Sequence, residues 1–122
     1  MVDDACGSDA EATADGLRSA GYRAESVEVD GSDAVQVDAM VQSAIGAFGS
    51  VEILVNNAGT SPVSPVLETS EEDWDRVMAV NLKGCFLCCK AVGRAMVEAG
   101  TAGRIVNITS TVGTNARPGA YA

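Results

Sequence analysis

Two apolar runs separated by a long helical pattern constrain the fold of this chain more than any other feature of its sequence. VEILV at 51–55 is almost entirely apolar, and RIVNIT at 104–109 is apolar at its centre. Such runs are typical of strands that are covered on both faces of a parallel sheet. The stretch 70–98 has apolar residues at helical spacing, and parallel strands need a long crossover of that kind. The sequence therefore predicts a strand, a covering helix and a second, parallel strand.

The first half of the chain repeats this alternation. The segment SDAE at 8–11 has the form of a capping box, which predicts a helix that starts there and ends near Gly21. AESVEV at 24–29 reads as a short strand, and Asp33 opens a second helix that runs to Gly49. Alternating helices and strands build a parallel sheet through right-handed crossovers. We therefore expect an α/β fold with a doubly wound parallel sheet.

The longest predicted helix begins after the N-cap Ser70 and has a continuous apolar side. Gly84 and Gly93 weaken it locally. The apolar side is formed by Trp74, Val77, Met78, Leu82, Phe86, Cys89 and Met96.

Charge and composition exclude several classes of protein. Of the 122 residues, 47% are apolar and 20% are charged, which is a globular balance for one domain. The net charge is −9, and residues 1–50 hold ten acidic side chains against two arginines, so we expect no nucleic-acid partner. No apolar run approaches the roughly 20 residues of a membrane span, and the N-terminus lacks the pattern of a signal peptide. We expect a soluble, cytoplasmic protein with no membrane partner.

The cysteines do not form a recognisable metal or disulfide framework. Cys85 and Cys88 match C-x-x-C, but the chain has no histidine and no second cysteine pair that would complete a zinc site. On a helix, positions 85, 88 and 89 share one face. We therefore expect no metal and interpret these cysteines as small buried apolar side chains.

Ligands of doubly wound sheets bind beyond the carboxyl ends of the strands, and polar residues follow two of the predicted strands. Asp30 could accept a hydrogen bond from a ligand or cap the following helix. Asn57, with Ala58 and Gly59 after it, leaves room for a flat ligand against the main chain. The same residues could equally form a plain turn in which Asn side chains bind loop amides.

The third strand end carries a hydroxyl pair, Ser110 and Tyr121. One hydroxyl could polarise a carbonyl oxygen while the other exchanges a proton with it. A tyrosine does this poorly at neutral pH unless a positive charge lowers its pKa. The chain has no histidine to activate Ser110 as a nucleophile, which argues against a Ser-His-Asp hydrolase. A surface serine and a tyrosine that anchors a loop remain the alternative.

Taken together and in this order, these segments resemble the middle of the short-chain dehydrogenase/reductase family, in the ordinary branch related to 3-oxoacyl carrier-protein reductases. VEILVNNAG at 51–59 is similar to its fourth strand and NNAG motif. WDRVMAVNLKGCFLCCKAV at 74–92 is similar to its long helix, and GRIVNITS at 103–110 to its fifth strand. The resemblance spans essentially the whole chain and implies a Rossmann-like sheet.

The resemblance also implies an activity and its residues. The family interconverts alcohols and ketones by hydride transfer with a nicotinamide cofactor. Ser110 would polarise the substrate oxygen, Tyr121 would be the acid/base, and Asn81 would support a water in the proton relay. Asp4 would bind the adenosine ribose hydroxyls, which favours NAD over NADP because a carboxylate repels a 2′-phosphate. The implied cofactor-binding residues are Asp4, Asp30, Gly31, Asn57, Ala58 and Gly59.

The chain lacks several parts of the family's pattern. The glycine-rich TGxxxGxG turn with the first strand and first helix, the lysine four residues after Tyr121, and the later strands have no counterpart in it. We therefore expect residues 1–122 to be a partial NAD(P)-binding Rossmann-like domain from a longer protein, inactive by itself. A loss of the central first strand leaves unpaired sheet edges and an uncovered apolar face.

Other functions remain open. The parent protein is expected to be a homo-oligomer that pairs through the helix 71–98 and acts on a small alcohol or ketone whose identity the sequence does not give. A different possibility is a non-catalytic chain that pairs with full-length subunits through the helix around 82–98. An epimerase or dehydratase of the family's extended branch is a third, but NNAG argues against it.

Overall fold

The computed structural model describes residues 2–4, 7–61 and 64–111, in which helices and strands alternate along the chain. The elements are β1 (Val2–Asp4), α1 (Gly7–Ser19), β2 (Ser26–Glu28), α2 (Ala34–Phe48), β3 (Ile53–Asn56), η1 (Val66–Glu68), α3 (Glu71–Met78), η2 (Ala79–Gly84), α4 (Cys85–Glu98) and β4 (Arg104–Asn107). Here η1 is a short 3₁₀ helix and η2 is a π-helix that joins α3 to α4.

Three of the predicted helix ends follow the predicted local chemistry, whereas α1 begins at Gly7, so Ser8 lies inside the helix, and Glu11 accepts hydrogen bonds from Arg18 and Ser26. The Asp33 carboxylate accepts hydrogen bonds from the backbone amides of Val35 and Gln36 at the start of α2, which satisfies two of the amides that a first turn leaves without partners. Ser70 Oγ accepts from the amide of Asp73 at the start of α3. Gly21 has a φ of 89° just beyond α1, a left-handed conformation that glycine adopts without strain.

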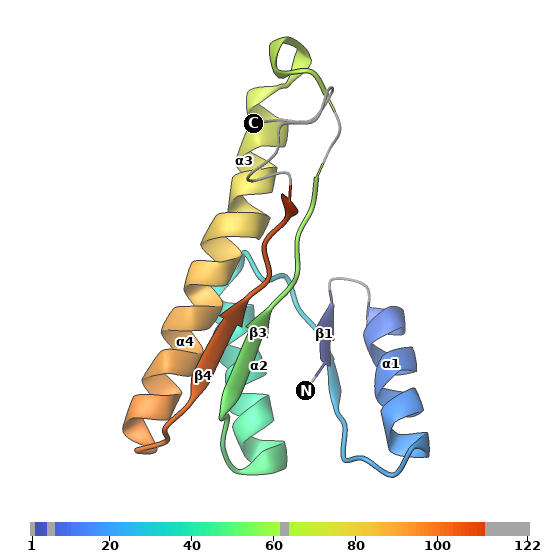
Figure 1. Cartoon of the computed structure of the whole chain (residues 1–122), viewed down its shortest axis with the longest axis vertical. Coiled ribbons are helices and arrows are strands. Elements are labelled where there is room, and N and C mark those ends of the chain that lie inside the picture. Colours follow the sequence, from blue (N-terminus) through green and yellow to red (C-terminus); the bar gives the residue numbers. More distant parts are fainter. Residues whose placement is uncertain (1, 5–6, 62–63, 112–122) are drawn as a thin grey trace.

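All strand pairing in the described residues is parallel, which confirms the predicted α/β class. β1 pairs with β2, and β3 pairs with β4 in a register that places Asn56 opposite Asn107. The two pairs form separate two-stranded sheets. In Figure 1, β1 and β2 run beside α1, whereas β3 and β4 run beside α2 and α4. The sheet is incomplete, as expected from the resemblance, which places a further strand between the two pairs.

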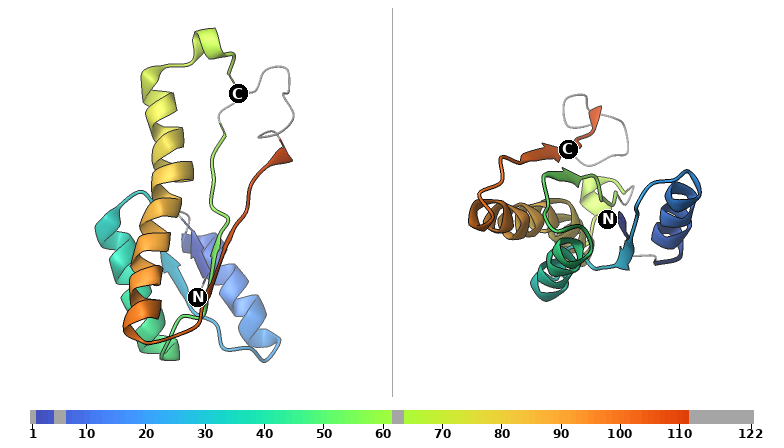
Figure 2. Two further views of the ribbon diagram at one scale, coloured as in Figure 1. Left: turned by 60° about the vertical axis from the view of Figure 1, so that its left-hand side comes forward. Right: turned by 90° about the horizontal axis from the view of Figure 1, so that it is seen from below.

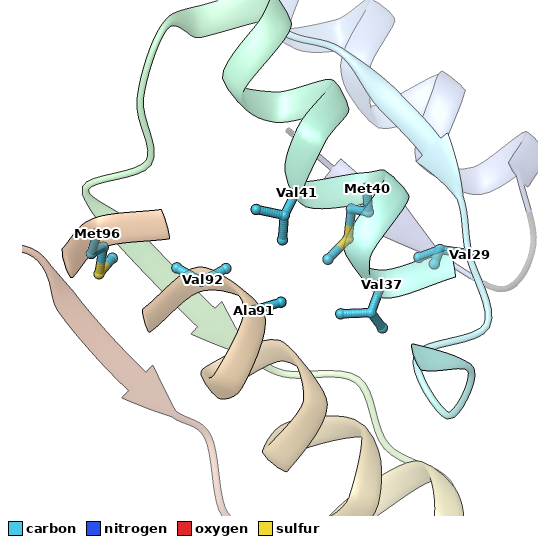
Figure 3. Packing of buried hydrophobic residues seen from close by; sticks show 7 residues of the cluster. All are labelled: Val29, Val37, Met40, Val41, Ala91, Val92 and Met96. Carbon is cyan, nitrogen blue, oxygen red and sulfur yellow. The ribbon is translucent and has the colours of Figure 1, made fainter. Parts of the chain in front are cut away.

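The core lies between α2 and α4 and the face of β3 that they cover. Viewed from below, both helices lie on the same side of β3 and β4 (Figure 2). Figure 3 shows how the buried side chains of α2 and α4 point toward one another. The cluster contains Val29, Val37, Met40, Val41, Ala91, Val92 and Met96. Val37 is 1% exposed, and complete burial of such a side chain contributes about 1.5–3 kcal/mol.

The expectation that both apolar strands are covered on two faces is wrong for the described residues. Leu54 packs against the core, but Ile53 is 65% and Val55 is 53% exposed. All four residues of β4 are exposed. For β3 the reason is that side chains alternate between the faces of a strand, and α2 and α4 both lie on the same face. An uncovered apolar face therefore exists, as the incomplete sheet implied.

The apolar side predicted for the long helix does not form one buried stripe. Trp74, Leu82 and Phe86 are exposed, whereas the residues of α4 that are buried are Ala91, Val92 and Met96. A π-helix bonds residue i to i+5 rather than i+4. An apolar stripe predicted with a constant α-helical period therefore points to different faces of the helix before and after residues 79–84.

The helical cysteines are less buried than expected. Cys85, Cys88 and Cys89 are all reduced and partly exposed. Among the described residues, no helix combines the length and apolar character needed to cross a membrane.

Candidate functional site

The π-helix η2 holds the loop that follows β3 through one side chain. Asn81 Oδ1 accepts a hydrogen bond from the backbone amide of Thr60 at 2.8 Å. Asn81 Nδ2 donates to the backbone carbonyl of Thr60, also at 2.8 Å. The Asn81 side-chain amide thus donates one hydrogen bond to the Thr60 backbone and accepts one from it, as the backbone of a neighbouring strand would. The carboxyl-terminal loop of β3 is thereby fixed against the helix at the point where the helix is interrupted.

The loop that follows β2 lies against the same segment. A Cβ added to the buried Gly84 would lie 3.2 Å from the carbonyl oxygen of Gly31, which is closer than side chains normally approach backbone. Only a glycine leaves this approach unobstructed. The loops at the carboxyl ends of β2 and β3 therefore both contact η2, through Gly84 and Asn81 respectively.

Asp30 does not cap α2, because that role belongs to Asp33. Its Oδ1 atom instead accepts hydrogen bonds from the backbone amide of Ser32 at 2.8 Å and from the Ser32 hydroxyl at 2.7 Å. The Ser32 hydroxyl, then the Ser32 amide and more weakly Lys83, lower the pKa of Asp30 below its ordinary value. The side chain is therefore an exposed, ionised hydrogen-bond acceptor at the edge of the β1–β2 pair.

The two adjacent asparagines after β3 have different environments. Asn56 is partly buried, and its Nδ2 atom donates to Asn107 Oδ1 at 2.8 Å, so it bridges β3 and β4. Asn57 is exposed. Ala58 and Gly59 are also exposed, and an added Cβ on Gly59 would make only ordinary contact with Asn81. The strand end therefore presents a polar amide beside an open stretch of main chain.

Ser110 follows β4 at the same edge of the sheet. The amide of Ile108 donates to the carbonyl of Asn56, so pairing with β3 continues beyond Asn107. Ser110 is exposed two residues later. Asp4 is the last residue of β1, at the carboxyl end of the other strand pair. Tyr121 lies outside the described residues.

Three contributors to this arrangement have no direct signal in the sequence. Thr60 takes part only through its backbone, which any residue possesses. Gly84 reads in the sequence as a weak point of a helix, although a glycine there can equally indicate close approach of another segment. Asn107 is the last residue of β4, and its only signal, an indirect one, was a polar side chain within the apolar run RIVNIT. Within the described residues, no three His, Cys, Asp or Glu side chains gather as metal ligands would.

Comparisons with known proteins give one consistent result. A family model described as "short chain dehydrogenase" matches residues 3–122. A subunit of (2S)-[(R)-hydroxy(phenyl)methyl]succinyl-CoA dehydrogenase from Thauera aromatica is 43% identical over 110 residues, covering 90% of this chain and 44% of that protein. A 3-oxoacyl-[acyl-carrier-protein] reductase from Synechocystis is 38% identical over 99 residues, covering 81% of this chain and 40% of that protein.

A solved structure matches the fold closely. A short chain dehydrogenase/reductase from Burkholderia phymatum, crystallised in complex with NAD, superposes with a TM-score of 0.91 at 33% identity. The superposition covers 97% of this chain and 42% of the other. The chain thus spans less than half the length of the relatives it matches.

Proposed function

The chain belongs to the short-chain dehydrogenase family, and we propose that it forms the cofactor-binding and serine-bearing part of an NAD(P)-dependent oxidoreductase that interconverts an alcohol and a ketone. The observation that carries the proposal is the junction at η2, where Asn81 and Gly84 contact the loops that follow β3 and β2. In a parallel sheet these loops surround the ligand site. The η2 segment therefore fixes the distance between the loop after β2 and the loop after β3.

The residues at these loops fit a dinucleotide. Asp30, as an ionised acceptor, suits the amino group of an adenine that lies across the edge, next to Gly31. Asn57 offers both a donor and an acceptor to a ribose hydroxyl. Ala58 and Gly59 are exposed and leave space for a flat group against the backbone. Each of these contacts is part of the proposal.

NAD is favoured over NADP. Asp4 ends β1, next to the position where the ribose of the adenosine would lie, and a carboxylate binds two ribose hydroxyls but repels a 2′-phosphate. The Burkholderia phymatum relative is in complex with NAD, which supports the same choice. A cytoplasmic location stays a prediction from the sequence.

The bound cofactor would supply the hydride acceptor or donor. Ser110 would donate a hydrogen bond to the substrate oxygen and so stabilise the charge that develops there. Tyr121 would accept the proton of the alcohol during oxidation and return it during reduction. Asn81 is held rigidly by Thr60, and its π-helical turn would position a water that relays this proton to solvent.

A graft tests this function. Residues 3–122 would replace the matching segment of the Synechocystis reductase, which supplies the remainder of the fold. We expect the chimera to interconvert a 3-oxoacyl thioester and its 3-hydroxy form, faster with NADH than with NADPH. Ser110→Ala and Tyr121→Phe are each expected to lower kcat by about 10²–10⁴-fold, measured by absorbance of the reduced cofactor.

The matched control is Ser43→Ala, which removes an exposed hydroxyl of α2 far from these loops. It should leave kcat unchanged. A folded, active chimera in which Ser110→Ala retains full turnover would contradict the proposed role, and a preference for NADPH would contradict the assignment of Asp4.

A second candidate function rests on an exposed apolar surface of the long helix. Leu82 is 61% and Phe86 is 59% exposed. Together with Met78, Ala79 and Lys83 they line an open apolar hollow. Such a surface suits a helix of another subunit, which is also where we propose that the longer protein forms homo-oligomers. Under this second function the chain would bind a full-length relative without binding cofactor.

Co-purification distinguishes the two functions. The chain would be co-expressed with a tagged full-length relative, and Phe86→Glu should abolish capture if this surface is the interface. Val97→Glu is the matched control, because Val97 is even more exposed on α4 than Phe86 but lies outside the hollow. Capture that survives Phe86→Glu would reject this interface.

A further inference from the structure

Four side chains at the ends of β3 and β4 lie in a ring whose members are joined by three hydrogen bonds. The Cys85 thiol donates to Asn107 Oδ1 at 3.4 Å. Asn56 Nδ2 donates to the same Asn107 oxygen at 2.8 Å and to Cys89 Sγ at 3.3 Å. Cys89 is close enough to raise the pKa of the Cys85 thiol, after the larger effect of burial, so the two thiols are neighbours. We call this set, Asn56, Cys85, Cys89 and Asn107, the thiol–amide ring. It brings two thiols of α4 together against the ends of β3 and β4.

The helix sets the distance between the two thiols. Cys85 and Cys89 are four residues apart in α4, and Cβ atoms at that spacing are about 5–6 Å apart. A disulfide requires Cβ atoms at about 3.5–4.5 Å, so the regular helix disfavours an S–S bond between them. An ion between the two sulfurs, with metal–sulfur bonds of about 2.3 Å, spans a wider gap without distorting the helix.

The ligand set selects the type of ion. Thiolates are soft ligands and prefer soft metals such as Cu(I). Zinc in a structural site takes four ligands, and no such group of His, Cys, Asp or Glu gathers in the part of the chain that the structure describes. We propose that Cys85 and Cys89 together bind one soft monovalent ion of the Cu(I) class as a two-coordinate bis-thiolate.

Binding of the ion changes the protonation of the two thiols and the hydrogen bonds of the neighbouring asparagine amides. Burial and the adjacent Cys89 raise the pKa of the Cys85 thiol, so the ion displaces protons rather than meeting a preformed thiolate. One Cu(I) ion replaces both thiol protons, which leave to solvent, and no electron is transferred. The Asn56 amide continues to donate to Cys89 and stabilises its negative charge, since hydrogen bonds to a charged form favour it. Asn107 loses one donor but keeps its bond from Asn56.

This site differs from the one that the C-x-x-C pattern indicates. The sequence pattern pairs Cys85 with Cys88, whereas the hydrogen-bonded ring pairs Cys85 with Cys89. Cys88 therefore provides a matched control on the same helix. The inference is independent of the proposed oxidoreductase function, because its readout is metal binding.

The test is an anaerobic titration of the purified chain with Cu(I) in competition with a chromogenic Cu(I) chelator. We expect one tightly bound ion per chain. Cys85→Ser and Cys89→Ser should each lower the apparent affinity by about 10²-fold or more, because the second thiol acts at high effective concentration. Cys88→Ser should leave it unchanged. An affinity that falls as much in Cys88→Ser as in Cys89→Ser would overturn the proposal.

A second measurement uses the unaltered chain and does not depend on the folding of variants. Thiols would be alkylated with iodoacetamide with and without one equivalent of Cu(I), and the modified cysteines identified by mass spectrometry. Selective protection of Cys85 and Cys89 supports the site. Protection of Cys85 with Cys88, or of no particular pair, contradicts it.

Discussion

Replacing Ile53 and Val55 by threonine is expected to raise the concentration at which the chain self-associates. These side chains lie on the uncovered face of β3 and are 65% and 53% exposed. At about 2 kcal/mol for complete burial of one such side chain, covering the exposed parts would contribute roughly 1.3 and 1.1 kcal/mol per chain. An exposed apolar face beside unpaired strand edges favours association between copies.

The size of the effect follows from the substitution. Threonine keeps one methyl group and β-branching, so the double variant gives up about half of this contribution and retains strand propensity. A dimer that buries the face on both chains then loses about 2.4 kcal/mol, which is roughly a 50-fold weaker Kd. Sedimentation velocity over a range of concentrations measures the shift.

The control is Val35→Thr, which alters a side chain of α2 that is even more exposed but lies away from this face. It should not change the association. The reasoning is refuted if the double variant associates at the same concentration as the unaltered chain, or if Val35→Thr has an equal effect.

Two further predictions concern local structure. Asn81→Ala should speed hydrogen exchange of the Thr60 amide about fivefold, because a lost hydrogen bond costs about 1 kcal/mol; Asn57→Ala should not, and an unchanged Thr60 rate would disprove the contact. The amides of Val35 and Gln36 lower the pKa of Asp33 below its ordinary value of 3.8, so its stabilisation of α2 is complete above that value and is lost as the pH falls through the lowered pKa. Circular dichroism should show helicity falling below about pH 3.8, and this component should vanish in Asp33→Asn, which caps without titrating; an identical acid transition in that variant would exclude the explanation.

The secondary structure was predictable because its signals are local. The cap at Asp33 and the glycine at 21 act within one helical turn, so the sequence alone places the ends of these helices closely. The parallel arrangement followed from the alternation of elements, which leaves few topologies.

Burial was less predictable because it depends on what covers a strand. Ile53 and Val55 read as buried from their apolar neighbours, yet exposure is decided by the helices that pack on each face. The π-helix had no sequence signal of its own, and it shifted the faces of Leu82 and Phe86 relative to the constant period assumed for the helix.

The residues of the candidate site likewise fall into those that could be predicted from the sequence and those that could not. Asn57 and Ser110 were found from strand ends, and Asn81 from the family resemblance, because each has a distinctive side chain. The partners that organise the site act through backbone, as Thr60 and Gly31 do, and backbone atoms leave no trace in residue identity. The thiol–amide ring required the three-dimensional contact between helix and strands, since Cys89 and Asn56 are 33 residues apart in the chain.

The double hydrogen bond between Asn81 and Thr60 also restricts how this position can evolve. Aspartate offers only acceptors, serine is too short to present a donor and an acceptor side by side, and glutamine matches the chemistry with a longer reach. No single-nucleotide change converts an asparagine codon to glutamine, so we expect every one-step amino-acid replacement at this codon to break at least one of the two bonds. Replacement of Asn81 during evolution is therefore expected to pass through variants in which the loop after β3 is held less firmly. Where such variants are not tolerated, we expect the asparagine to be retained.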